Sequence, residues 1–164
     1  MPQKDYILRL IEEAVDALAQ ILGLRDAGRP EQALEQVDRT ARRFIGLDLQ
    51  QLDFLPYDAL RDVLSSGGRL DLPRFLLLAE LRRLEGELRD DLYGPGAGRR
   101  QSILAFRLFL EVAETEGPAG LGGYREQLDQ VAERLEVEAA DDPAVAGLLS
   151  ACLRLPKHVH FSPE

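Results

Sequence analysis

Apolar residues recur along most of the chain at spacings of three and four, which is the period of one face of an α-helix. The alternating pattern of a half-buried strand is hard to find, and Leu, Ala, Glu, Gln and Arg fill the segments between glycines. The pattern therefore predicts an all-α protein. The expected helices run from about 5 to 24, 30 to 45, 56 to 64, 71 to 93, 99 to 116, 124 to 135 and 143 to 152.

The first expected helix carries two apolar stripes. One consists of Ile7, Leu10, Ile11, Ala14, Leu18 and Ile21, and the other of Leu8, Val15 and Leu22. Two stripes make a wide apolar arc, which predicts packing on two sides of the helix. The second side would be covered either within the monomer or across a dimer interface, so a homodimer through the N-terminal helix is one expectation.

Turn residues separate the expected helices. Gly28 and Pro30 supply a helix stop and a helix start, and Gly46 ends the second helix. Asp71 is the expected cap of the long helix that follows. In this helix the five apolar residues Phe75–Ala79 predict the most buried segment of the protein.

The first two helices resemble a tetratricopeptide unit, with Gly28 at the turn and Ala33 at the small position of the second helix. The helices over 71–116 look like a second copy, in which Ser102 takes the place of Ala33. The two positions are separated by about two periods of the 34-residue repeat. We therefore expect a right-handed, tetratricopeptide-like superhelix of antiparallel hairpins, with an irregular helical bundle as the alternative.

One domain accounts for the whole chain under this interpretation, because 164 residues are enough to bury a core without a disulfide or a metal. Tetratricopeptide-like hairpins are expected over 1–116, capping helices over 121–155 and a tail over 156–164.

Two segments carry a resemblance to a known family. The opening QKDYILRLIE over 3–12 and the segment SGGRLD over 66–71 resemble the matching parts of a bacterial family of short helical proteins. The resemblance covers about the first 115 residues and implies tetratricopeptide-like hairpins in a bacterial protein. It implies no activity and no catalytic residue.

The net charge and the cysteine content indicate which classes of partner and which cellular compartment to expect. The net charge of −9 argues against general nucleic-acid binding, which needs clustered Lys and Arg. The single cysteine, Cys152, cannot form an internal bridge and fits a reducing compartment. Charges interrupt the first helical pattern, so no signal peptide or membrane span is expected. We expect a cytoplasmic protein that contacts neither nucleic acid nor membrane.

The sequence offers few residues that suit a catalytic site or a metal site. A di-metal site in a helical bundle uses Glu-x-x-His pairs, but the two histidines, His158 and His160, lie in the tail. They could form a surface zinc or nickel site, but adventitious metal binding by a frayed end is the preferred interpretation. Cys152 lacks a basic neighbour that would activate it as a nucleophile. We assign no catalytic residue, cofactor or metal ligand.

Three arginine pairs are the candidate partner-binding residues: Arg42 with Arg43, Arg82 with Arg83, and Arg99 with Arg100. A guanidinium matches the geometry of a carboxylate, so these pairs could rim a groove for an acidic peptide or a carboxylate terminus. Ordinary surface pairing with the glutamates nearby in sequence is the alternative.

A protein-interaction scaffold is therefore the function we expect. The alternatives are a self-associating structural homo-oligomer, and a small-molecule carrier or enzyme with a pocket between helices. The last has less support because no cluster of polar residues is visible on an apolar helix face.

Overall fold

The computed structural model describes residues 2–155 and confirms the all-α class. Within that range the chain forms eight α-helices, one 3-10 helix and one short β-hairpin. The elements in chain order are α1 (Pro2–Asp26), α2 (Pro30–Phe44), α3 (Leu49–Phe54), α4 (Tyr57–Val63), β1 (Ser65–Ser66), β2 (Arg69–Leu70), α5 (Leu72–Tyr93), α6 (Arg99–Glu116), η1 (Pro118–Tyr124), α7 (Arg125–Glu138) and α8 (Pro143–Leu153).

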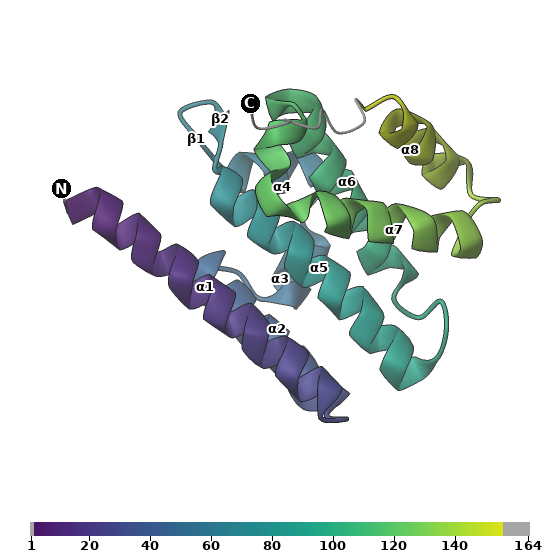
Figure 1. The fold of residues 1–164 in the computed structure, drawn as a ribbon, viewed down its shortest axis with the longest axis horizontal. Coiled ribbons are helices and arrows are strands. Elements are labelled where there is room, and N and C mark those ends of the chain that lie inside the picture. The colour runs from purple at the N-terminus through teal and green to yellow at the C-terminus, as the bar shows by residue number, and fades with distance from the viewer. Residues whose placement is uncertain (1, 156–164) are drawn as a thin grey trace, which may run out of the picture.

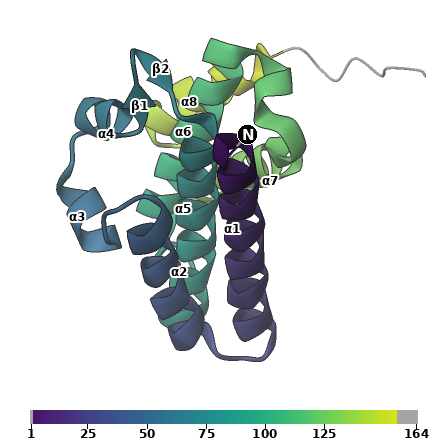
Figure 2. The same ribbon diagram turned by 90° about the vertical axis from the view of Figure 1, so that its left-hand side faces the viewer.

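Two long hairpins form the body of the molecule. Helices α1 and α2 lie side by side, as do α5 and α6, and α2 packs against α5 to join the hairpins (Figure 1). Helix α5 lies in the middle and contacts α1, α2, α6 and η1, while α7 and α8 cover α6 at the C-terminal end. Figure 2 shows α1, α2 and α5 running alongside one another. The two expected hairpins are present, whereas the superhelical twist of a repeat array stays a prediction.

The end of α2 is held by a side chain of α5. The Nε of Arg74 donates to the carbonyl of Phe44 at 3.0 Å, and its Nη2 donates to the carbonyl of Ile45 at 2.5 Å. These carbonyls lie at the C-terminal end of α2, where carbonyl groups have no amide donor within the helix. Arg74 therefore joins the two hairpins through backbone groups as well as through apolar contact.

Helix α3 was not predicted. It begins with a capping box, in which the Gln51 amide donates to Asp48 Oδ1 at 2.7 Å and the Asp48 amide donates to Gln51 Oε1 at 3.0 Å. Its six residues present too short an apolar pattern to be recognised by periodicity. Helix α4, in contrast, confirms the short helix expected over 56–64.

A two-residue turn closes the β-hairpin that follows α4. Ser65 pairs with Leu70 and Ser66 with Arg69, where a loop was expected. Gly67 and Gly68 occupy the turn with φ of +59° and +79°, which is the conformation that two-residue hairpin turns require.

Burial along α5 is more extensive than the sequence suggested. Within the segment predicted to be the most buried, Phe75 and Leu77–Ala79 are buried and Leu76 is half-buried, and the continuous buried stretch extends instead from Leu77 to Gly86. This stretch contains the charged side chains of Glu80, Arg82, Arg83 and Glu85. Helices on several sides of α5 leave none of its faces to solvent over these turns.

The C-terminal helices are covered less completely. Helix α7 buries one narrow apolar seam, which consists of Leu128, Val131 and Leu135. In α8 the Asp142 carboxylate caps the helix by accepting from the Ala144 amide at 2.9 Å. Val145 is the buried residue of this helix.

Across residues 2–155, none of the helices combines the length and the hydropathy needed to cross a bilayer.

Candidate interaction groove

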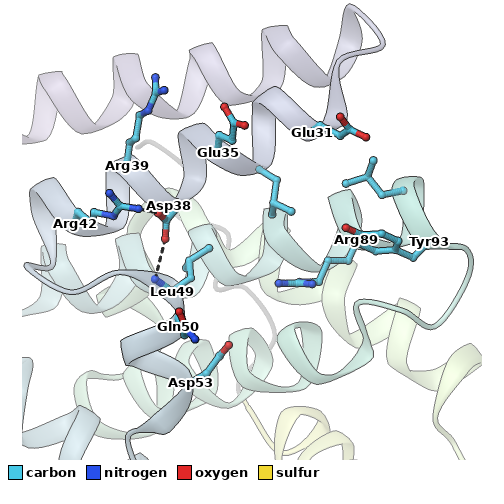
Figure 3. Close-up of a pocket in the computed structure, with 12 residues that line it drawn as sticks. Glu31, Glu35, Asp38, Arg39, Arg42, Leu49, Gln50, Asp53, Arg89 and Tyr93 are labelled. Atoms are coloured by element: carbon cyan, nitrogen blue, oxygen red, sulfur yellow. Dashed lines mark hydrogen bonds and ion pairs between the residues drawn. The ribbon is translucent and has the colours of Figure 1, made fainter.

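A groove of about 810 Å³ lies between α2, α3 and the C-terminal end of α5. We call it the α2–α3–α5 groove (Figure 3). Its lining residues are Glu31, Leu34, Glu35, Asp38, Arg39, Arg42, Leu49, Gln50, Asp53, Arg89, Leu92 and Tyr93.

The position of α3 shapes the groove. The amide of Leu49, at the first turn of α3, donates to Asp38 Oδ1 at 3.0 Å and ties this turn to α2 (Figure 3). At the other end of α3, Asp53 Oδ1 lies 2.8 Å from Arg82 Nη2 of α5. These two contacts hold the short helix across the opening between α2 and α5.

Apolar side chains contribute part of the lining. Leu49 is buried at the foot of α3, and Leu34 and Leu92 are half-buried. Tyr93, at the end of α5, is 69 % exposed although it lines the groove. An exposed aromatic ring beside leucines is typical of protein-interaction surfaces.

The α2 side of the groove changes charge along its length. Glu31 and Glu35 lie toward the start of α2, and Arg39 and Arg42 lie toward its end (Figure 3). Arg42 forms an ion pair with Asp38, one turn away. Among residues 2–155, no ion pair involves Glu31, Glu35 or Arg39, so their charges are available to a ligand.

On the α5 and α3 sides of the groove, the charged side chains are paired with other residues of the protein. Arg89 donates from its Nε to Glu85 Oε1 at 3.1 Å, and the Asp53 carboxylate faces Arg82. The available charges of the groove therefore belong mainly to α2.

Arg42 and Arg43 point to different surfaces. Arg42 lines the α2–α3–α5 groove. Arg43 pairs instead with Glu13 of α1 at 2.7 Å, and its guanidinium lies 5.3 Å from the centre of the Phe44 ring. This residue joins the first hairpin and lies outside the groove.

Arg82 and Arg83 do not lie on an accessible rim. They are 1 % and 8 % exposed, because α5 is enclosed by its neighbours. Arg82 Nη1 donates to Glu85 Oε2 at 2.7 Å, while Arg83 pairs with Glu80 at 2.7 Å and with Glu87 at 2.9 Å. A charge buried this deeply must be paired, so these arginines hold α5 together and are removed from the proposed binding surface.

Arg99 and Arg100, at the start of α6, contact different elements. Arg99 donates to the carbonyl of Glu138 at the end of α7. Arg100 donates to the carbonyl of Asp53 at 3.3 Å, at the end of α3. Both are exposed, and both connect neighbouring elements rather than forming a pair that faces one ligand.

A cluster around Tyr57 attaches α4 to α6. The Tyr57 hydroxyl donates to the Glu111 carboxylate, whose other oxygen lies 2.8 Å from Arg61 Nε. The guanidinium of Arg107 lies 3.7 Å from the centre of the Tyr57 ring. Burial and the adjacent Glu111 carboxylate raise the pKa of Tyr57 above its usual range.

Cys152 lies in a smaller hollow between α7 and α8. The hollow measures about 250 Å³ and also contains Arg125, Asp129 and Glu136. The thiol is half-buried, and burial raises its pKa although Arg125 acts in the opposite direction. A raised pKa lowers the thiolate fraction, so the hollow offers no activated nucleophile.

The metal hypothesis concerned His158 and His160, which lie outside the described residues. Within residues 2–155, no group of three or more His, Cys, Asp or Glu side chains is arranged to hold a metal ion.

Comparison of the chain with family models, curated proteins and solved structures found no match. The resemblance of the opening segment therefore rests on the residues over 3–12 and 66–71 alone.

Several groove residues were absent from our sequence-based candidates. Glu31, Glu35 and Arg39 looked like an ordinary solvated helix face, and Tyr93 looked like the last residue of a helix, because the sequence did not predict α3 opposite them.

Proposed function

We propose that this protein is an interaction module that binds a segment of a partner protein in the α2–α3–α5 groove. The observation that supports the proposal is the side of the groove formed by α2, where Glu31, Glu35 and Arg39 form no ion pair among the described residues. Available charges of both signs beside Leu34 and Tyr93 suit a ligand that brings opposite charges and apolar side chains.

A segment of a protein fits this lining better than a small metabolite does. The volume of the groove lies within the range of about 300 to 1,000 Å³ that small-molecule sites occupy. Such sites are lined mainly by apolar groups, whereas seven of the twelve lining residues here are charged. We therefore keep the carrier or enzyme as the runner-up.

The proposal places the protein in the bacterial cytoplasm, where its single cysteine would remain reduced. A tetratricopeptide-like stacking of the two hairpins would be consistent with it, since stacked helical hairpins present a concave binding surface. The net charge of −9 makes a protein partner more suitable than a nucleic acid.

Affinity capture at two salt concentrations tests the proposal. The tagged protein is compared with a variant that exchanges the two charges of α2, Glu35→Arg with Arg39→Glu. The exchange leaves the net charge at −9 and both side chains exposed. We expect a partner that the unaltered chain retains at low salt, releases more easily at high salt and loses in the variant.

A matched control exchanges two exposed charges away from the groove, Arg9→Glu with Glu114→Arg. This control keeps the same net charge and should retain the partner. Equal loss of the partner in both double variants would assign binding to overall charge distribution and overturn the groove. Equal retention in both would also overturn it.

A further inference from the structure

Helix α1 presents an apolar stripe to solvent. Leu8, Ile11, Val15 and Leu22 are 56, 41, 56 and 40 % exposed. Their spacing places them on one face of the helix, as in the seam of a coiled coil. The packed face of the same helix is a different one and includes the fully buried Ile21. Of the two stripes expected for this helix, the one made of Leu8, Val15 and Leu22 is therefore left uncovered in the monomer. The other is covered in part, because Leu10, Ala14 and Leu18 are half-buried while Ile11 is exposed.

We propose that this stripe pairs α1 with α1 of a second copy of the chain, in antiparallel orientation about a two-fold axis beside Val15. Leu8 and Leu22 lie seven positions on either side of Val15, so the axis brings each against the other. Ile11 and Ala19 lie four positions on either side, so a large side chain meets a small one. The stripe is thus complementary to itself, as a two-fold interface requires.

The charges beside the stripe fit this arrangement. Glu12 is the charged residue next to the stripe between Leu8 and Leu22, and antiparallel pairing places it at the level of Leu18 of the second copy, six positions from the second Glu12. Two carboxylates are therefore not brought together at the centre of the interface. The antiparallel orientation also opposes the macrodipoles of the two helices.

A lipid surface suits the stripe less well. Membrane-surface helices carry Lys and Arg beside the apolar face, which attract anionic headgroups. Helix α1 contains more acidic than basic residues, and this net negative charge would repel anionic headgroups. The acidic residues are Asp5, Glu12, Glu13, Asp16 and Asp26, and the basic ones are Lys4, Arg9 and Arg25.

The size of the stripe limits the strength of the pairing. Leu8 and Leu22 are about 21 Å apart at a rise of about 1.5 Å per residue. One helix pair of that length buries less than the total of about 1,600 Å² typical of a stable complex. We therefore expect association that depends on concentration in the micromolar range. No residue of α1 lines the α2–α3–α5 groove, so pairing leaves the groove open and does not depend on the proposed function.

Sedimentation equilibrium of the full chain tests the pairing over about 5 to 500 µM, a range that spans micromolar dissociation constants. The weight-average mass should rise from one chain toward two. Val15→Glu, which places two carboxylates at the axis, should weaken association at least about tenfold. The control Val137→Glu alters a valine that is 86 % exposed on α7 and should associate like the unaltered chain. An unaltered chain that stays monomeric throughout, or a Val15→Glu variant that associates equally well, would overturn the proposal.

Cysteine cross-linking tests the orientation in a Cys152→Ser background. Val15→Cys should cross-link to itself, and Leu8→Cys should cross-link to Leu22→Cys in a mixture of the two variants. Antiparallel pairing keeps two copies of residue 8 about 21 Å apart, so Leu8→Cys alone should stay uncross-linked. Efficient cross-linking of Leu8→Cys to itself would overturn the antiparallel arrangement.

Discussion

Gly98 lies directly against the backbone of Gly86. A Cβ atom at Gly98 would lie 1.9 Å from the carbonyl oxygen of Gly86. A Cβ atom at Gly86 would lie 2.7 Å from Ser102 Oγ and 3.0 Å from the carbonyl oxygen of Gly98. The start of α6 therefore packs on the middle of α5 through backbone contact, which places the second hairpin.

Substitution of Gly98 by alanine should separate these helices. The added methyl group meets backbone atoms that cannot rotate away, so we expect Gly98→Ala to lower the free energy of unfolding by about 3 kcal/mol. Urea unfolding measures the loss. Gly147→Ala in α8 is the matched control, because a Cβ there meets nothing within 4 Å. The control should gain up to about 1 kcal/mol from helix propensity. Equal stability of Gly98→Ala and the unaltered chain would contradict the close approach.

The buried pair of Arg82 and Glu85 gives a second prediction. Their side chains are 1 % and 0 % exposed, so Glu85→Ala would leave a buried guanidinium without its closest carboxylate. We expect a loss of about 3 to 5 kcal/mol in the free energy of unfolding. The control Glu114→Ala, an exposed residue of α6, should change stability by less than about 0.5 kcal/mol.

A double variant that removes the charges of both Arg82 and Glu85 distinguishes the effect of an unpaired buried charge from the effect of lost side-chain volume. An Arg82→Met, Glu85→Leu double variant replaces the pair with apolar groups of similar volume, and should recover much of the stability lost in Glu85→Ala. A double variant that is less stable than Glu85→Ala would show that the contact between Arg82 and Asp53, which the double variant also removes, contributes to stability.

Sequence pattern predicted most helices but misplaced the charges of α5. Arg82 and Arg83 were expected on the surface, either at the rim of a groove or in ordinary surface ion pairs. That interpretation failed for Arg82 and Arg83 because packing of two hairpins, and not local periodicity, determines whether a polar face is covered. The spacing of Glu and Arg at three and four positions was visible, but it is equally typical of an exposed helix.

The groove could not be predicted for a related reason. Its α2 residues were visible as a charged helix face, but a groove requires an opposite wall. That wall is α3, whose placement depends on the contact between the Leu49 amide and Asp38, and on the ion pair between Asp53 and Arg82. Both contacts join segments far apart in sequence, and periodicity carries no information about them.

The Tyr57 cluster predicts a loss of stability at high pH. A tyrosine in the unfolded chain ionises near pH 10, whereas burial and Glu111 raise the pKa of Tyr57 in the folded chain. The unfolded state alone therefore releases this proton as the pH rises above about 10, so the contribution is present below that pH and is lost above it. Tyr57→Phe should lower stability at neutral pH and make its decline above pH 10 shallower.

Chemical unfolding at a series of pH values measures this slope, and ultraviolet titration of the phenols gives a second readout. Tyr57→Phe should remove a late-titrating phenol. The control Tyr93→Phe removes the hydroxyl group of an exposed tyrosine and should leave the slope unchanged. If the stability of Tyr57→Phe declined above pH 10 as steeply as that of the unaltered chain, the attribution of this decline to Tyr57 would be contradicted.

The cap of α3 gives a test that links local structure to the proposed function. Asp48→Ala removes the capping box, should cost about 1 kcal/mol, and should fray the helix that forms one wall of the groove. Asp142→Ala removes the cap of α8 at similar expected cost, at a site away from the groove. If α3 shapes the binding surface, both variants lose similar stability in urea, but Asp48→Ala alone retains several-fold less partner in affinity capture. Retention of the partner by a destabilised Asp48→Ala variant would show that binding does not need an ordered α3.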